Sequence, residues 1–568
     1  MTKVFNNPTR FVDDSLKGFL RLYPQLVEPV YGGVVRSTES PAGKVAVVIG
    51  GGSGHYPAFA GWVGPGLADG AVVGNVFASP STQQIYSVAK AAETGGGVFF
   101  SYGNYAGDVL NFDLAQERLR AEGIDTQTVA VSDDVTSADA SEWFKRRGVA
   151  GDLPVFKIAG AAAEEGYTLA EVTRVAGQAN ASTFSFGVAF AGCTLPGSTE
   201  PLFTVPKGKM EVGMGVHGEP GIAEQDVATS AELAALLVER LLTEKPAGAG
   251  SRAAVIVNGL GGTKYEELFV LFNDIAGLLD DASVEIVAPE VGELITSLDM
   301  AGASLTLVWL DDELERLWLA ETQTPAFRRG SGIATTQRTE HAAAAVEVEG
   351  YPDASDDSRA AASALLTGLT AVASALHEQE EELGRLDAIA GDGDHGRGMT
   401  NGADAALAAA TKAVDGGAGI ASTLAAAGDA WADKSGGTSG ALWGNGLRAA
   451  SETLSDTAAP TGADGAAAVQ AGLELVLSFG KAELGDKTML DALIPFVETL
   501  NEGVGSGLPF GAAWLAAAEI ADAEAVKTAE LSPRIGRARP LAARSIGHAD
   551  PGAVSLALVM GVIGKNLG

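Results

Sequence analysis

The sequence predicts an α/β N-terminal domain followed by an all-α C-terminal domain. In residues 1–330, short β-branched or aromatic runs alternate with amphipathic stretches, the pattern of βαβ units. From residue 358 to 568 the chain is rich in alanine and other strong helix formers, and β-branched runs are scarce. Residues 331–357 lose periodicity and are the expected linker.

The strand-like runs are expected to form mainly parallel sheets, because helical patterns separate some of them. A change of texture toward small residues and turns predicts a boundary between two α/β subdomains near 185–200. The expected strands lie at 44–50, 96–101, 128–132, 253–259, 284–290 and 304–310, and the clearest intervening helices at 230–244 and 265–279.

Composition narrows the possible partners and compartment. The net charge of −34 makes nucleic acid and anionic membranes poor partners, and an acidic protein that handles phosphates needs a cation such as Mg²⁺. Cys193 is the single cysteine, so no disulfide framework exists. Met1–Arg10 has no apolar signal core, and no run of about 18 apolar residues suggests a membrane span. We therefore expect a cytoplasmic protein.

An acidic cluster in the C-terminal domain is a candidate metal site. Asp387, Asp392 and Asp394 fall within eight residues, in RLDAIAGDGDHG. Converging carboxylates repel one another unless a hard cation neutralises them, and oxygen ligands suit Mg²⁺. The alternative is a solvated Asp-Gly turn. Downstream, the loop KSGGTSG is suited to phosphate at a helix start, or is a simple helix–helix turn; the chain has no Walker A pattern.

Three segments of the N-terminal domain carry candidate polar groups. His55 lies in GGGSGHYP after an apolar run, where open α/β sheets bind ligands. Asp108 follows another expected strand and is either a functional acid or a helix N-cap. His217, in GMGVHGEPG, is a base, a nucleophile toward a carbonyl carbon, or a structural residue.

Taken together, the motifs resemble the dihydroxyacetone kinase family in its single-chain form, a K-type domain fused to an L-type domain. They are GGGSGH, NYxGD and HGEPG, then DxxxGDGDHG, GGTSG and RSIGHxDPG, in this order. The resemblance implies an L-type domain that is a helical barrel, and an ATP-dependent kinase of short ketoses. It also implies a homodimer with swapped domains.

The resemblance implies a role for each matched residue. His217 would hold the substrate carbonyl as a covalent hemiaminal, with His55 and Asp108 as the other catalytic residues and Gly52 and Ser53 in the substrate loop. Asp387, Asp392 and Asp394 would bind two Mg²⁺ ions that bridge the ATP phosphates. The expected nucleotide-binding residues are His395, Ser435, Gly436, Thr438 and Ser439 in the phosphate loops, and Gly485, Met489, Arg537 and Asp550 in the enclosing segments.

The chain departs from the usual family pattern beside the substrate. It has Tyr56 and Phe59 where dihydroxyacetone-specific members usually have an acid and a histidine, and Gly103 where they usually have a lysine. We interpret this as a change of substrate toward a larger ketose such as erythrulose; neutral drift is the alternative. Two other functions remain open: a cyclising lyase acting on FAD at the same metal site, and a non-catalytic sensor or co-regulator.

Overall fold

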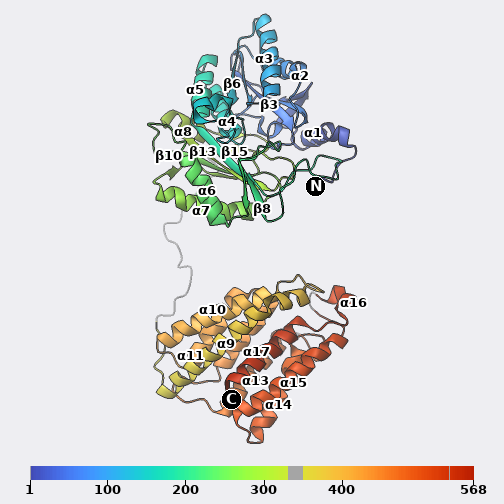
Figure 1. The fold of residues 1–568 in the computed structure, drawn as a ribbon, viewed down its shortest axis with the longest axis vertical. Helices are drawn as coiled ribbons and strands as arrows, with labels where there is room; N and C mark the ends of the chain where they lie inside the picture. The colour runs from blue at the N-terminus through green and yellow to red at the C-terminus, as the bar shows by residue number, and fades with distance from the viewer. Residues whose placement is uncertain (1, 331–349, 481, 536–537, 568) are drawn as a thin grey trace. The chain divides into compact units, whose positions relative to one another are not determined.

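The computed structural model describes residues 2–330, 350–480, 482–535 and 538–567. The chain forms two compact units, Met1–Gln337 and Arg338–Gly568 (Figure 1). Most of the expected linker, residues 331–349, lies outside the described residues. The predicted fold class, α/β and then all-α, is confirmed.

The first sheet of the N-terminal unit has the strand order β1-β2-β4-β3-β5-β6 and is parallel from β4 to β6. Helices α2 and α3 pack on one face, and α4 and α5 pack on the other. Both faces of the sheet are buried, so the side chains of adjacent residues in one strand pack into different hydrophobic cores. Val47 packs on the side of α4 and α5, and Val48 packs on the side of α2 and α3. The strands are β1 (Val27–Val30), β2 (Gly33–Arg36), β3 (Ala46–Ser53), β4 (Gly70–Val76), β5 (Val98–Gly103) and β6 (Thr126–Val131), and the helices are α2 (Thr82–Ala92), α3 (Ala106–Ala121), α4 (Asp152–Glu164) and α5 (Leu169–Ala181).

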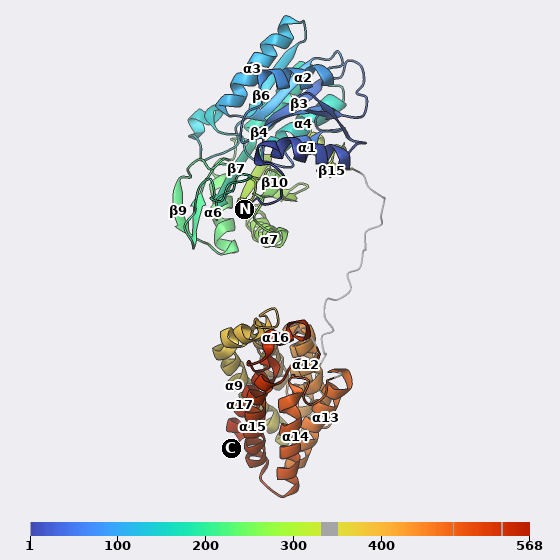
Figure 2. The same ribbon diagram turned by 90° about the vertical axis from the view of Figure 1, so that its right-hand side faces the viewer.

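The second sheet has the order β11-β10-β13-β7-β8-β9, with β12 beside β10, and α6 and α7 cover one face (Figure 2). Its strands from β10 through β13 and β7 to β9 pair antiparallel, so the expectation of mainly parallel sheets is wrong here. Its elements are β7 (Thr183–Ala189), β8 (Lys209–Val212), β9 (Ala223–Asp226), α6 (Ser230–Leu242), β10 (Arg252–Gly259), α7 (Tyr265–Asp281), β11 (Glu285–Ile286), β12 (Glu290–Gly292) and β13 (Gly302–Trp309).

Two segments differ from the sequence expectation. The expected strand 284–290 is divided into the short strands β11 and β12. The small-residue stretch after residue 180 contains strand β7, which is central in the second sheet, so the chain passes from the first sheet to the second between α5 and β7. The N-terminal unit also contains α1 (Phe11–Leu22), α8 (Asp312–Leu319) and the hairpin of β14 (Thr322–Gln323) and β15 (Arg328–Arg329).

In the C-terminal unit, consecutive long helices pack side by side from α9 to α15, α17 packs on α15, and α17 returns to α9, which closes a helical barrel (Figure 1). Small residues allow this close packing: Gly402 lies against the ring of Trp431, and Gly444 against Ala432. The helices are α9 (Asp356–Asp387), α10 (His395–Asp415), α11 (Ile420–Ser435), α12 (Gly437–Ser451), α13 (Gly462–Gly480), α14 (Leu490–Gly505), α15 (Phe510–Lys527), α16 (Ala542–Ser545) and α17 (Pro551–Leu567).

Helix α9 is long and apolar enough, by length and composition alone, to cross a membrane. In the structure it packs against α10, α11 and α17, and buries Val372, Leu376 and Leu383 in the barrel core. Its apolar residues are therefore used in the packing of the C-terminal unit.

Candidate active site

His55 follows the carboxyl end of strand β3 and is buried in the N-terminal unit. Its Nδ1 lies 2.7 Å from the carbonyl oxygen of Thr296, and its Nε2 lies 3.0 Å from Nε2 of His217. Burial, and then the neighbouring His217, lower the pKa of His55 to about 3. His55 is therefore a neutral imidazole that donates from Nδ1 and accepts at Nε2.

His217 lies in the loop between strands β8 and β9 and is held by Glu219. The backbone N–H of His217 donates to Oε2 of Glu219 at 3.0 Å, and its Nδ1 lies 3.1 Å from Oε1. Burial raises the pKa of Glu219, but the hydrogen bond and charge of His217 outweigh it and hold this pKa at about 2. Arg147 lies 3.8 Å from Glu219 and forms a closer pair with Asp134. Glu219 is therefore an ionised carboxylate.

The histidine pair holds one proton more than two neutral rings. The pair makes three contacts, to Thr296, between the two rings and to Glu219, and each contact needs one hydrogen. The Thr296 carbonyl and the Glu219 carboxylate can only accept a hydrogen bond. Two neutral imidazoles supply only two N–H groups. Because burial keeps His55 neutral, donor counting assigns the third hydrogen to His217, which then donates from both nitrogens and balances the charge of Glu219.

Asp108 lies in the first turn of α3, which follows strand β5. The N-cap of α3 is Tyr105, so the alternative that Asp108 is the helix cap is wrong. Burial raises the pKa of Asp108 to about 6, although a hydrogen bond from Ser79 and the charge of His217 oppose the shift. A carboxyl group of this kind exchanges a proton near neutrality.

Asp108, His55 and His217 line one small cavity of about 30 Å³. Gly52 lines it too, as do Phe59 and Gly103, whereas Ser53 and Tyr56 do not. The remaining lining residues are Gly50, Gly51, Tyr105, Gly148, Val149, Asp152, Val216 and Ile295.

Two residues expected at the substrate lie elsewhere. The hydroxyl group of Ser53 donates to the carbonyl of Gly74 at 2.6 Å. Tyr56 is half exposed and its ring packs on Phe19.

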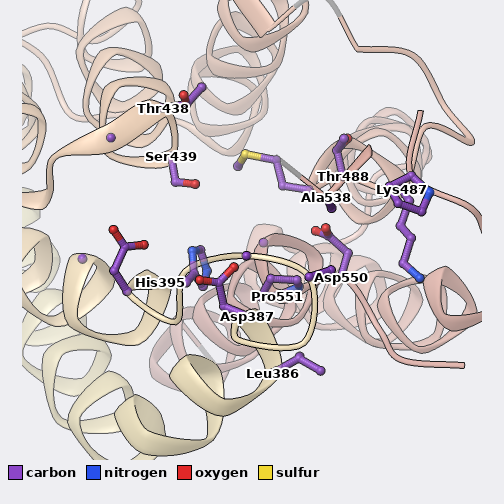
Figure 3. A pocket seen from close by; sticks show the side chains of 18 of the residues that line it. Leu386, Asp387, His395, Thr438, Ser439, Lys487, Thr488, Ala538, Asp550 and Pro551 are labelled. Carbon is purple, nitrogen blue, oxygen red and sulfur yellow. The ribbon is translucent and has the colours of Figure 1, made fainter. Parts of the chain in front are cut away.

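The second cavity, of about 390 Å³, lies at one end of the helical barrel (Figure 3). Asp387 ends α9, Asp394 precedes α10, and Asp392 lies in the loop between them. Each of the three offers a carboxylate oxygen within 4.8 Å of the others. The N–H of Gly393 donates to Asp387 at 2.8 Å and so fixes the loop.

This acidic cluster fits a magnesium ion. Asp392 and Asp394 are exposed and Asp387 is half-buried, so solvent and a phosphate could supply the other ligands that Mg²⁺ requires. The loop is also tight: a Cβ on Gly391 would collide with the carboxylate of Asp387.

A loop rich in glycine, serine and threonine lies across the cavity from the acidic cluster. Ser435, Gly436, Thr438 and Ser439 line the cavity, and helix α12 begins at Gly437. Gly436 and Gly437 have φ of 68° and 62°, which favours glycine at this sharp junction. Figure 3 shows Thr438 and Ser439 on one side of the cavity and Asp387 and His395 on the other. Free N–H groups at a helix start suit an anion.

The other expected nucleotide residues divide into two groups. His395, Met489 and Asp550 line the cavity, and Nε2 of His395 lies 2.9 Å from the hydroxyl group of Ser555. Burial raises the pKa of Asp550 to about 7.

Gly485 does not line the cavity; its N–H donates to Asp491 at 2.6 Å and supports the loop. Arg537 lies outside the described residues.

The chain matches two family models. Residues 17–326 match the Dak1 domain, and residues 389–565 match the DAK2 domain. It is 55% identical to the D-erythrulose kinase of Mycolicibacterium smegmatis, over 98% of this chain and 97% of that one. It is 53% identical to the L-erythrulose kinase of Pectobacterium atrosepticum, over 99% and 96%.

A solved structure has the same two-part organisation. The dihydroxyacetone kinase from C. freundii in complex with AMP-PNP and Mg²⁺ is 32% identical, with a TM-score of 0.60 and 99% of each chain covered. Dak1 and Dak2 domains joined in one chain define a fused two-domain protein. The chain belongs to the dihydroxyacetone kinase family.

Sequence reasoning missed several residues that line or support the cavities. Tyr105 and Asp152 line the first cavity, and Glu219 holds His217. Lys487 lines the second, and its Nζ donates to the carbonyl oxygens of Leu531 and Ser545 at 3.0 and 2.7 Å. Glu219 was visible in the HGEPG motif; Asp152 has no local signal, because the fold brings it to the cavity from the start of α4.

Proposed function

We propose that this protein is an ATP-dependent kinase that phosphorylates a terminal hydroxyl group of a short ketose, erythrulose or dihydroxyacetone. The observation that carries the proposal is the hydrogen-bonded chain Thr296–His55–His217–Glu219 beside Asp108 in one cavity. The names of the two erythrulose kinases, each similar over nearly the full chain, support the same substrate class. The enzyme class is a phosphotransferase with an alcohol group as acceptor.

The proposed covalent step uses the extra proton of the histidine pair. Nε2 of His217 forms a bond to the carbonyl carbon, and the proton between the two Nε2 atoms moves to the carbonyl oxygen, which becomes a hydroxyl group. Nδ1 of His217 keeps its hydrogen bond to Glu219, so the adduct is a hemiaminal on a cationic imidazole ring. One positive charge is present before and after, and the Glu219 carboxylate balances it in both states.

Asp108 is the proposed proton acceptor for the hydroxyl group that is phosphorylated. Its pKa of about 6 leaves it mostly ionised at neutral pH, yet it binds a proton far more readily than an exposed aspartate. The covalent bond to His217 would hold the ketose in a fixed position, and a fixed position of the reacting hydroxyl group increases the rate of phosphoryl transfer. His55 remains neutral and accepts hydrogen bonds from the adduct.

In the second unit we propose that Asp387, Asp392 and Asp394 hold Mg²⁺ with the ATP phosphates. Mg²⁺ neutralises phosphate charge as the phosphoryl group leaves. Ser435, Gly436, Thr438 and Ser439 would bind phosphate oxygens, while His395, Met489 and Asp550 enclose the nucleotide. We include two Mg²⁺ ions in this proposal.

We also propose that the protein is a homodimer, which light scattering tests. The proposed domain limits are 1–330 for the first domain, 331–357 for the linker and 358–568 for the second domain.

The test is a kinetic panel with ATP and Mg²⁺. Dihydroxyacetone, D-erythrulose, L-erythrulose, glyceraldehyde and glycerol are compared by ADP release and by mass spectrometry of the products. We expect phosphorylated ketose, and no product from glycerol, which has no carbonyl group. Cyclic phosphate formed from FAD without a ketose would support the lyase alternative. Absence of turnover with every substrate would support the co-regulator and refute the kinase.

A further inference from the structure

Asp152 is the first residue of helix α4 and lies at the wall of the ketose cavity. Its side chain is buried, with 3% of the residue exposed. Its Oδ1 has no hydrogen-bond partner among the described residues.

Asp152 is the first residue of α4, its N-cap is Gly151, and no side chain caps this helix. The nearby Asp133 accepts from the backbone N–H of Val149 at 2.8 Å and of Gly151 at 2.7 Å, which fixes the loop before the helix. Burial, and then the two neighbouring acids Asp133 and Asp108, raise the pKa of Asp152. A buried acid without donor or cation destabilises the fold unless something else binds it.

The same cavity contains two other buried polar atoms without a partner, Oδ1 of Asp108 and the hydroxyl group of Tyr105. The other unpartnered side-chain atoms in the described part of the chain are four tryptophan nitrogens, one threonine hydroxyl and one oxygen of Glu315. Three residues that each have one unpartnered oxygen thus line one small cavity. Their complement is a small molecule with several hydroxyl groups.

We propose that Asp152 binds the hydroxyl group on the arm of the ketose that is not phosphorylated, and so selects polyhydroxylated ketones. This inference rests on the proposed function, in which His217 takes the carbonyl carbon and Asp108 the hydroxyl that is phosphorylated. One hydroxyl-bearing arm then remains for Asp152.

The electrostatic environment agrees with this role. Burial, then the charges of Asp133 and Asp108, raise the pKa of Asp152 well above its usual range. Burial therefore favours the protonated form of Asp152, and one carboxylic acid group can both donate to a hydroxyl oxygen and accept from a hydroxyl hydrogen.

Backbone atoms close the cavity next to Asp152. A Cβ on Gly148 would collide with the Cα of Gly103, and a Cβ on Gly103 would lie 3.2 Å from the carbonyl oxygen of Gly148. The two glycines of this wall have no side-chain donor. The polar side chains beside them in the described cavity are the carboxyl group of Asp152 and the hydroxyl group of Tyr105.

The test compares dihydroxyacetone with hydroxyacetone, which has the same carbonyl and one hydroxyl group to phosphorylate but lacks the other. We expect Asp152→Ala to lower kcat/KM for dihydroxyacetone and erythrulose about ten- to a hundredfold, the effect of one lost hydrogen bond in a buried site. The kcat/KM for hydroxyacetone should change by less than about threefold. Asp152→Asn, which keeps a donor and an acceptor, should lie between wild type and Asp152→Ala.

A control and a stability measurement separate the possible outcomes. Asp113 is an exposed acid on α3, and Asp113→Ala should leave kcat/KM for both substrates unchanged. Asp152→Ala should keep or raise the Tm, because the acid has no partner in the free protein. An equal loss of kcat/KM for both ketones would refute selection by Asp152. A lower Tm together with loss of activity toward both ketones would refute it too, and so would an unchanged kcat/KM for both. Wild-type protein that phosphorylates no ketose would instead refute the proposed function.

Discussion

The two cavities hold their aspartates in opposite ways. In the cavity of the N-terminal unit Asp108 and Asp152 are buried, and burial raises the pKa of each. In the cavity of the C-terminal unit Asp392 and Asp394 are exposed and, with Asp387, bring oxygens within 4.8 Å of one another. An isolated buried carboxyl group exchanges or shares a proton, whereas clustered exposed carboxylates attract a cation. The surroundings of an aspartate therefore decide which chemistry it can support.

The cavities differ also in how their polar groups are arranged. The histidines of the first cavity form a hydrogen-bonded chain with Thr296 and Glu219. The second is about 390 Å³ and is lined by loops and helix ends. Under the proposed function, a substitution in the first cavity should change the kinetic parameters for the ketose, and one in the second cavity those for ATP. The following predictions test whether the two effects are separate.

The largest effect is expected at the acidic cluster. Asp392→Ala should lower kcat by about a thousandfold with every ketose, because a metal ion supplies several kcal/mol of charge stabilisation. Ketose binding, measured by calorimetry, should stay the same. Asp404→Ala, an exposed acid on α10 paired with His377, is the control and should be silent. A normal rate in Asp392→Ala would refute the metal assignment.

Glu219→Gln should lower kcat/KM for ketoses about ten- to a hundredfold, since a hydrogen bond to a charged group contributes about 1.5–3 kcal/mol. The amide cannot balance the cationic ring of His217. The KM for ATP should not change. Glu224→Gln, at an exposed position of strand β9, is the matched control. If the two variants behave alike, the proton count of the histidine pair is wrong.

The third prediction concerns pH. Because the pKa of Asp108 is about 6, kcat/KM for the ketose should fall about tenfold per pH unit below pH 6 as the base is protonated. ATP binding is measured over the same pH range as a separate readout, because Asp550, whose pKa is raised to about 7, lines the other cavity. A flat ketose profile down to pH 5 would exclude Asp108 as the base.

The same group makes a prediction for stability. The pKa of Asp108 rises from 3.8 to about 6, so its stabilising contribution is present below pH 3.8 and is lost as pH rises through 6. Asp108→Asn should therefore become more stable than wild type, by up to about 3 kcal/mol, as pH rises from 4 to 7. Urea unfolding at several pH values measures this difference.

The smallest effect is expected at the phosphate loop. Ser439→Ala should raise the KM for ATP about three- to tenfold, the effect of one hydrogen bond among several. The KM for the ketose should not change. Ser363→Ala, an exposed serine on α9, serves as control. A change in the ketose KM alone would contradict the separation of the two cavities.

Local spacing predicted the acidic cluster, because its three aspartates lie within eight residues. It also predicted the helical unit and three of the six strands of the first sheet, β3, β5 and β6. His217 was ambiguous as a histidine in a glycine turn, and its proposed role came from the family resemblance. The antiparallel second sheet was missed because helices separate its strands as they do in βαβ units. Strand β7 was missed because serine, glycine and alanine interrupt its apolar residues.

Asp152 could not be predicted as a cavity residue. Nothing in GVAGDLPV distinguishes an acid that caps a helix from one that faces a cavity. In the structure Asp152 is the first helical residue and not the N-cap, and the fold brings it to the cavity. Ser53 shows the converse. It was expected in the substrate loop, but its hydroxyl group donates a hydrogen bond to the carbonyl of Gly74.

The most direct test of the account is the state of the ketose carbon on His217. Dihydroxyacetone labelled with ¹³C at the carbonyl is added to the full-length protein and followed by NMR. We predict that the bound carbon moves from the carbonyl region to that of a tetrahedral carbon, and that His217→Gln abolishes this signal while ATP still binds. A bound ketose that keeps its carbonyl signal in wild-type protein, together with phosphorylation at the normal rate, would contradict the account.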